Sequence, residues 1–170
     1  NKVDSAKKEN TQLVLNNIKK YNPRAKVILA RSELIVDKPE LINGRKCVIV
    51  GDGPTLSHGG MAFGAGTLAV QKYGGIAVDP RAYTLGSIKE TFNKFKHLHY
   101  EIPAMGYSTY QINELERTIR RIPCDTIVDG TPANLKKILN LNKPVVNVNY
   151  ELDKKSVKKL EGILKRLKFI

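Results

Sequence analysis

The chain has 170 residues, enough for one domain with its own hydrophobic core or for one domain joined to the end of another. Hydrophobic residues make up 41% of it and charged residues 26%, as in an ordinary globular protein, and no apolar stretch approaches the roughly 18 to 20 residues that span a bilayer. We therefore expect a water-soluble cytoplasmic protein with no membrane partner. The formal net charge of +13 favours partners that carry phosphate, whether metabolites, nucleotides or nucleic acid.

The first elements in chain order are a helix and a short strand. Apolar residues recur at helical spacing between Lys7 and Tyr21, which predicts an amphipathic helix that ends before Pro23. Val27–Leu29 then has the composition of a short buried strand, and we predict one there.

A domain boundary is expected soon after this strand. The segment Asp37–Asn43 contains proline and is typical of a connector, which places the boundary near residues 41–45. The chain is thus divided into residues 1–43 and residues 44–170.

The rest of the chain alternates between apolar strands and helices. We expect strands at 47–50, 76–78, 126–128 and 145–148, and helices at 67–73, 87–95, 109–121, from Thr131 onward, and at 154–168. Such alternation predicts an α/β fold with a mostly parallel sheet and helices on both faces, a Rossmann-like arrangement. Ligands of these sheets bind beyond the carboxyl ends of the strands, so the loops 51–66, 79–83 and 129–131 are expected along one edge.

Two cysteines, Cys47 and Cys124, lie inside apolar runs. Neither has a Cys or His nearby at the spacing of metal ligands. We therefore predict buried, reduced thiols and no metal site.

A glycine-rich run, Gly51–Gly66, follows the strand at 47–50. Its glycines permit positive φ and close approach of the backbone, so amides can point at an anion while the next helix adds its N-terminal dipole. We predict that the run binds phosphate or carboxylate, and that His58 acts as a catalytic acid or base. The candidate ligands are Gly53, Thr55, Ser57, Gly59, Gly60, Gly64 and Gly66. The alternative is a structural loop whose glycines serve tight turns, with a structural His58.

Four residues outside this run are further candidates. Arg81 could clamp a phosphate with its planar guanidinium, and Lys89 lies on the helix that follows; we assign both, with His58, to catalysis. Tyr107 and Thr131 are candidates for binding substrate phosphate. Each also has a structural explanation: solvated cations for Arg81 and Lys89, packing for Tyr107, and closing of a helix for Thr131.

The helix at 154–168 carries a basic stripe opposite an apolar face. Such a stripe could hold nucleic acid or an acidic partner, but a solvated face explains it as well. The chain has neither an aromatic-rich sheet motif nor zinc-ligand spacing, so we do not expect nucleic acid as a partner.

The chain begins with Asn1-Lys2-Val3-Asp4, which matches the Asn-Lys-x-Asp motif that recognises guanine in GTPases. In that motif the carboxylate accepts hydrogen bonds from the ring N–H and the amino group of the base. Asn1, Lys2 and Asp4 are therefore candidates for binding a nucleotide base. Capping of the first helix by Asp4 or Ser5 explains the same residues.

Six strings distributed over nearly the whole chain share one resemblance. They are NKVD (1–4), GDGPTLSHGGMAFGAGT (51–67), VDPRAYTLGSI (78–88), PAMGY (103–107), CDTIVDGTP (124–132) and NKPVVNVNYEL (142–152). Together they resemble the predicted-GTPase family related to archaeal cyclic 2,3-diphosphoglycerate synthetase. The long string at 51–67 is the most specific of them.

This resemblance implies the C-terminal part of a multi-domain P-loop protein. The synthetase uses ATP to close 2,3-diphosphoglycerate into a cyclic phosphoanhydride, so the resemblance implies Mg²⁺ with ATP or GTP and a phosphorylated small molecule as substrate. It places Thr55, His58, Gly59, Gly60 and Arg81 on the substrate side, and residues 1–4 beside the nucleotide base. The P-loop pattern itself, Gly-x-x-x-x-Gly-Lys-Ser/Thr, is absent from this sequence. We therefore expect residues 1–43 to be the last helix and strand of a P-loop domain, and the chain alone to be inactive.

A second hypothesis is a binding or assembly module. On this view the chain forms a homodimer or docks a GTPase partner through the basic helix, and the glycine-rich run is structural. The choice between ATP and GTP is left open, because Asn-Lys-x-Asp favours guanine whereas the resemblance to the synthetase favours ATP.

Overall fold

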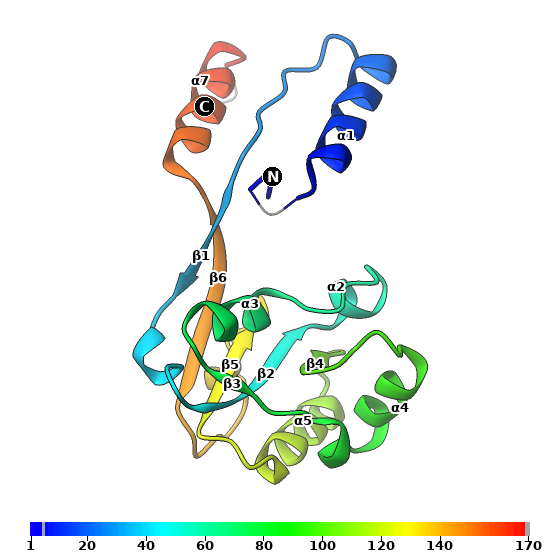
Figure 1. The fold of residues 1–170 in the computed structure, drawn as a ribbon, viewed down its shortest axis with the longest axis vertical. Coiled ribbons are helices and arrows are strands. Elements are labelled where there is room, and N and C mark those ends of the chain that lie inside the picture. The colour runs from blue at the N-terminus through cyan, green and yellow to red at the C-terminus, as the bar shows by residue number, and fades with distance from the viewer. Residues whose placement is uncertain (5, 169–170) are drawn as a thin grey trace. The chain divides into compact units, whose positions relative to one another are not determined.

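A computed structural model describes residues 1–4 and 6–168 (Figure 1). The chain divides into two compact units: unit 1 comprises residues 1–33 and 150–170, and unit 2 comprises residues 34–149. Within the described residues, no helix has the length and apolar character needed to cross a membrane.

Six strands form one sheet. They are β1 (Ser32–Val36), β2 (Lys46–Asp52), β3 (Ile76–Ala77), β4 (Glu101–Ala104), β5 (Thr126–Gly130) and β6 (Val145–Leu152). The order is β1-β6-β5-β2-β3, and β4 also pairs with β2, beyond the short β3. β2 is parallel to β3, β4 and β5, and β5 is parallel to β6. β1 is antiparallel to β6, since Arg31 bonds to Asp153 and Asp37 to Asn147. The predicted α/β fold with a mostly parallel sheet is confirmed.

Helices cover both faces of the sheet (Figure 1). The consecutive buried residues of β2 require this cover, because their side chains point alternately to the two faces. On one face, Val48 and Val50 join a core that includes Ile88 of α4 (Gly86–Lys94) and Leu115 of α5 (Thr109–Arg121). On the other face, α3 (Ala65–Lys72) packs against β2 and β5. The side chains that alternate along β2 thereby fix two layers of helix around one sheet.

Several predicted elements were wrong or incomplete. Val27–Leu29 is not a strand, and the first strand begins only at Ser32. β4 was missed because it is short and carries Glu101 and Pro103; an edge strand tolerates proline because one side of it needs no N–H donor. The glycine-rich run was expected to be a loop, yet it begins with the short helix α2 (Gly53–Ser57).

The helix after β5 also starts later than predicted. α6 (Leu135–Ile138) follows Asn134, so Thr131 is not its cap. The carboxylate of Asp129 explains the delay, because it accepts hydrogen bonds from the amides of both Thr131 and Leu135 and holds the intervening residues in a turn.

Both cysteines are buried free thiols, as predicted. Burial raises the pKa of the Cys47 thiol to about 11. A thiol with this pKa is protonated and unreactive at neutral pH.

Unit 1 contains α1 (Lys8–Tyr21) and α7 (Lys154–Arg166). The residue before α1, Lys7, makes no side-chain cap, and Asp4 instead accepts a hydrogen bond from the amide of Ser32 at 3.3 Å. The alternative cap, Ser5, lies outside the described residues. α7 is capped by Asp153, whose pKa the hydrogen bonds from Ser156 and Arg31 lower to about 2.

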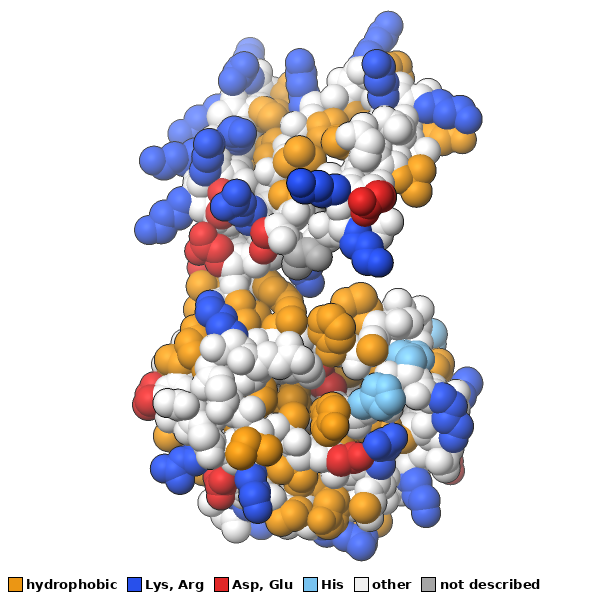
Figure 2. All heavy atoms as spheres, in the orientation of Figure 1, with side chains coloured by type: hydrophobic (Ala, Val, Ile, Leu, Met, Phe, Trp, Pro, Cys, Tyr) orange, Lys and Arg blue, Asp and Glu red, His pale blue; other side chains and the backbone are white. Residues whose placement is uncertain are grey.

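The two helices of unit 1 have little buried surface. α1 contains no buried residue, and the only buried residue of α7 is Ser156. Unit 1 also holds fifteen of the 29 Lys and Arg residues and six of the 16 Asp and Glu residues, so it carries +9 of the net +13. Figure 2 shows these basic side chains crowded over α1 and α7. The charge that suggested phosphate partners therefore lies mostly outside unit 2.

Candidate functional site

The carboxyl ends of three strands meet at one edge of the sheet. The register places Asp52 of β2 opposite Ala104 of β4, and Gly51 opposite Gly130 of β5. From β2 the chain continues to β3 and β4 on one side and then returns to β5 on the other, so the strand order reverses between β2 and β5. Open α/β sheets bind their ligands at such a reversal. We call this part of the sheet the switch-point edge and take it as the candidate site.

The loop 79–83, predicted at the same edge, does not reach it. β3 has two residues, and they pair with Lys46 and Cys47 at the beginning of β2 rather than at its end. The loop that follows β3 is therefore placed at a different level of the sheet from Asp52 and Gly130.

The glycine-rich run begins at the switch-point edge with α2. Oδ2 of Asp52 accepts hydrogen bonds from the amide of Thr55 at 3.3 Å and from its hydroxyl at 2.5 Å. The hydroxyl of Ser57 donates to the carbonyl of Gly53 at 2.7 Å. The predicted phosphate ligands Thr55 and Ser57 thus direct their hydroxyls to acceptors within α2. Among the described residues Oδ1 of Asp52 has no hydrogen-bond donor, so one carboxylate oxygen is open at the edge.

A buried carboxylate occupies the N-terminus of α3. Glu101, on β4, is 1% exposed, and its Oε2 accepts hydrogen bonds from the Gly64 amide at 2.5 Å and the Thr67 hydroxyl at 2.8 Å. A Cβ on Gly64 would lie 2.7 Å from Oε1 of Glu101, and a Cβ on Gly51 would overlap the same atom. Burial raises the pKa of Glu101, and the bonds from Gly64, Thr67 and Gly66 partly offset that rise.

The acceptor at this helix end is therefore a side chain of the protein itself. Gly64 and Gly66 were predicted as phosphate ligands; a Cβ on Gly64 would meet the carboxylate of Glu101, whereas a Cβ on Gly66 would meet the side chain of Ile49. The amides of Gly64 and Gly66 already donate to Glu101. At Gly53, a Cβ would collide with the carbonyl of Ala104, so only glycine fits there.

A second cluster surrounds the end of β5. Asp129 is 2% exposed, and its Oδ1 accepts hydrogen bonds from the amide of Thr131 at 3.0 Å and from its hydroxyl at 2.7 Å. Burial raises the pKa of Asp129. Tyr107 lies in the same cluster: burial raises the pKa of its phenol, and the charges of Asp52 and Asp129 raise it further, against a hydrogen bond with Thr131. The structure thus brings Tyr107 and Thr131 together with two aspartates.

His58 follows α2 and is exposed. Its Nδ1 lies 3.0 Å from the hydroxyl of Ser57, and its ring centroid is 6.3 Å from that of Phe95. His97, whose Nε2 is 2.9 Å from the carbonyl of Leu56, also contacts Phe95, and Figure 2 shows histidines gathered on the visible face of unit 2. Among the described residues no carboxylate bonds to His58, so its catalytic role stays a prediction.

Gly59 and Gly60 extend the chain beyond His58. Gly60 has a φ of +62°, which favours glycine for steric reasons. This turn accounts for Gly60 without a ligand, and phosphate binding there stays a prediction.

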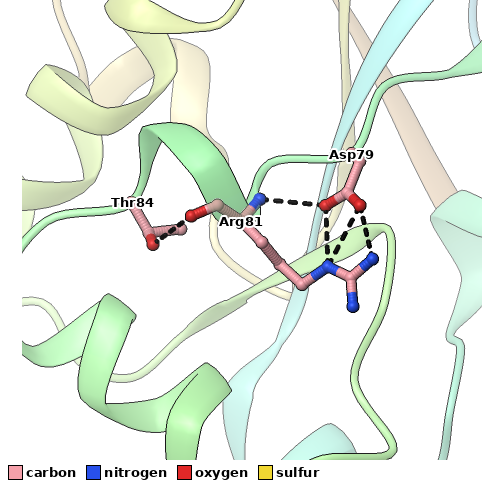
Figure 3. Close-up of polar contacts among 3 residues, drawn as sticks. All are labelled: Asp79, Arg81 and Thr84. Atoms are coloured by element: carbon pink, nitrogen blue, oxygen red, sulfur yellow. Dashed lines mark hydrogen bonds and ion pairs between the residues drawn. The ribbon is translucent and has the colours of Figure 1, made fainter.

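Arg81 and Lys89 come together, but away from the switch-point edge. Both side chains line a pocket of about 160 Å³ that also includes Thr84 and Lys96. The guanidinium of Arg81 donates to both carboxylate oxygens of Asp79, and the Arg81 amide bonds to Oδ1 of the same carboxylate at 3.0 Å (Figure 3). His58 does not line this pocket, so the three predicted catalytic residues do not form one cluster.

The candidate base-binding residues lie in unit 1. Val3 bonds through its amide to the carbonyl of Ala30 at 3.2 Å, which together with the bond from Ser32 to Asp4 holds the start of the chain beside residues 30–32. Lys2 has its ammonium 3.9 Å from the centroid of the Tyr150 ring. Recognition of a base by Asn1, Lys2 and Asp4 stays a prediction.

Sequence reasoning missed the three acids that organise the site. Glu101 begins β4, Asp129 lies within the apolar strand β5, and Asp52 ends β2. An acid inside an apolar run is itself a signal, because a buried carboxylate needs donors and therefore marks a built polar site. The described residues contain no group of three or more His, Cys, Asp or Glu residues that could hold a metal ion.

The structure defines an α/β domain in which the switch-point edge is the candidate site. Comparison with curated proteins shows that 165 residues are 50% identical to part of the arginine synthetase ArcE of Thermococcus kodakarensis. The match covers 96% of this chain and 37% of that protein, so the chain is homologous to a portion of it and spans little more than a third of its length.

No family model and no solved structure matches the chain. None of these findings names the family related to cyclic 2,3-diphosphoglycerate synthetase, and that resemblance stays a prediction.

Proposed function

We propose that this chain is the substrate-binding portion of a nucleotide-dependent synthetase related to ArcE, and that it binds arginine or its immediate precursor at the switch-point edge. The match to ArcE over 96% of the chain is the observation that carries this proposal. A synthetase of this kind would use Mg²⁺ with ATP or GTP. The nucleotide would be held mainly by the part of the enzyme that has no counterpart in this chain.

The charge at the switch-point edge supports a cationic substrate. The negative charges of Asp52 and Asp129 both raise the pKa of Tyr107. Among the described residues, Oδ1 of Asp52 accepts no hydrogen bond and can therefore pair with a ligand. A guanidinium or an α-ammonium group pairs well with an open carboxylate, whereas 2,3-diphosphoglycerate would meet repulsion. The tyrosine and threonine hydroxyls add neutral hydrogen-bonding groups that can orient a polar substrate.

The test measures the binding of arginine to the chain by calorimetry and by changes in amide chemical shifts. Asp52→Asn keeps the cap of α2, because asparagine is as good an N-cap as aspartate, but removes the charge. We expect this substitution to weaken arginine binding about tenfold, the effect of one charge-assisted hydrogen bond. Glu90→Gln, on the exposed side of α4, is the matched control and should change nothing. Equal binding by wild type and Asp52→Asn would overturn the assignment, as would arginine shifts confined to unit 1.

The remaining part of the synthetase is proposed to pack on unit 1. The chain has no counterpart to 63% of ArcE, and α1 and α7 leave their apolar side chains largely unburied. Unit 1 also contains a pocket of about 250 Å³ between α1 and residues 27–29, with Val14, Ile18 and Val27 among its lining residues. An apolar socket of this kind fits side chains of another domain.

A further inference from the structure

The pocket beside α4 gathers cationic side chains from three successive segments of unit 2. Arg81 comes from the turn after β3, Lys89 from α4, and Lys96 from the residues that follow α4. Asn93 lies one helical turn after Lys89 and therefore on the same face of α4. All three residues line the same pocket, although their like charges repel one another.

The orientation of Arg81 is fixed while part of its guanidinium stays open. Nε and Nη2 donate to Asp79, and the hydroxyl of Thr84 donates to the Arg81 carbonyl at 2.9 Å (Figure 3). An arginine has five N–H donors, and in the described part of the chain no acceptor bonds to the two donors of Nη1. Asp79 thus holds the side chain in place and balances its charge, and the adjacent donors remain free to bind a ligand.

The other polar groups of the pocket are also open. Among the described residues, the side chains of Lys89, Asn93 and Lys96 have no hydrogen-bond or ion-pair partner. Phe92 is 7% exposed and Leu98 is 2% exposed, so the pocket has an apolar floor that strengthens electrostatic attraction above it. The two lysines supply two positive charges that no carboxylate of the pocket lining balances.

We propose that this pocket is a binding site for a phosphate group, separate from the switch-point edge. Its volume of about 160 Å³ is well below the roughly 300 to 1,000 Å³ of pockets that enclose a whole drug-sized ligand. It therefore accommodates free phosphate or one phosphoryl group of a larger ligand, with the ammonium groups, the Nη1 donors and the Asn93 amide around its oxygens. This inference goes beyond the proposed function and does not depend on it.

The test uses inorganic phosphate as the probe, with amide chemical shifts of the chain as the readout at low ionic strength. We expect shifts concentrated at residues 81–98, and binding that weakens as salt is raised. Lys89→Ala and Lys96→Ala should each weaken phosphate binding several-fold, and the double variant at least about tenfold. Both side chains are exposed, so the fold is expected to persist. Lys94→Ala is the matched control, because Lys94 lies on α4 but not in the pocket, and it should stay within about twofold of wild type.

Further arms identify the source of the phosphate group. If ATP or 2,3-diphosphoglycerate shifts the same residues more strongly than phosphate, the site holds a phosphoryl group of that larger ligand. Equal shifts indicate free phosphate. The proposal is overturned if phosphate perturbs other residues instead, if about 10 mM phosphate produces no shifts, or if Lys94→Ala weakens binding as much as the pocket variants.

Discussion

Buried acids complete the helix ends of unit 2. Glu101 accepts the first amides of α3, Glu114 accepts the amide of Ser87 near the start of α4 at 2.9 Å, and Asp129 accepts the amide of Leu135 at the start of α6. These carboxylates satisfy donors that a helix leaves unpaired, and they meet the positive end of each helix dipole. The N-termini of α3, α4 and α6 therefore already have an acidic side chain as acceptor.

Glu101 allows this arrangement to be tested through stability. Glu101→Ala would leave the amide of Gly64 and the hydroxyl of Thr67 without a buried acceptor, at a cost of about 3 kcal/mol in the free energy of unfolding. Glu101→Gln keeps an acceptor and the side-chain volume, so its cost should be about 1 kcal/mol or less. Urea unfolding at neutral pH measures both values.

The pH dependence of the same variants follows from the raised pKa of Glu101. Between the unfolded value, about 4.3, and the higher folded value, the folded protein binds more protons, so the contribution of Glu101 to stability declines as pH rises through that window. Glutamine does not titrate, so the stability of Glu101→Gln should rise relative to that of the wild type as pH increases above the unfolded pKa of glutamate. Glu90→Gln, at an exposed position, is the control and should stay within about 0.5 kcal/mol at every pH. A Gln variant as unstable as the Ala variant would contradict this account.

At the scale of elements, α5 shows what local sequence could predict. Its predicted bounds, 109–121, are those observed, because a regular apolar face is combined with a capping box between Ser108 and Gln111. β2 and β5 were also found, since each is a continuous apolar run. Elements with these local signals need no knowledge of their tertiary neighbours.

The elements that escaped prediction depend on distant partners. β4 is a strand only because it lies beside the second half of β2, and its Glu101 is tolerated only because α3 supplies donors. Part of the candidate site could be predicted, since the carboxyl ends of β2 and β5 do meet there. The presence of Asp52, Asp129 and Tyr107 in one place depends on strand order, which single-strand patterns do not contain.

Two glycines give a test of close packing between elements. A Cβ on Gly53 would collide with the carbonyl of Ala104, a backbone atom that cannot move aside without shifting β4. Gly53→Ala should therefore cost about 2 kcal/mol of stability. Gly162, in the middle of α7, has open space around the same position, so Gly162→Ala should raise helix content and stabilise α7 by about 0.5 to 1 kcal/mol. Circular dichroism measures the helix content and thermal unfolding the stability of each variant. If the two variants had the same stability, the close contact between Gly53 and the carbonyl of Ala104 would not be what excludes a Cβ at position 53.

At the scale of the whole molecule, unit 1 carries both most of the net charge and many of the exposed apolar side chains. Unit 2 has a closed core and a net charge of +4, the remainder after the +9 of unit 1. Unit 1 combines most of the charge with apolar side chains that stay in contact with water, including Leu13 at 59% and Leu160 at 41% exposure. Such a surface is expected of a segment that is completed by another part of a larger protein or by a second copy of the chain.

The two possibilities predict different behaviour of the isolated chain. If unit 1 packs against the rest of a synthetase in the whole enzyme, the isolated chain should be a monomer by light scattering and should bind a hydrophobic dye. The double variant Leu13→Ser/Leu160→Ser should lower dye binding while changing stability by no more than about 1 kcal/mol, because both side chains are already exposed. Met61→Ser, at a 42% exposed position of unit 2, is the control and should leave dye binding nearly unchanged. A dimer that the leucine substitutions dissociate would favour the assembly module instead, because the apolar surface of unit 1 would then already have its partner in a second copy of the chain.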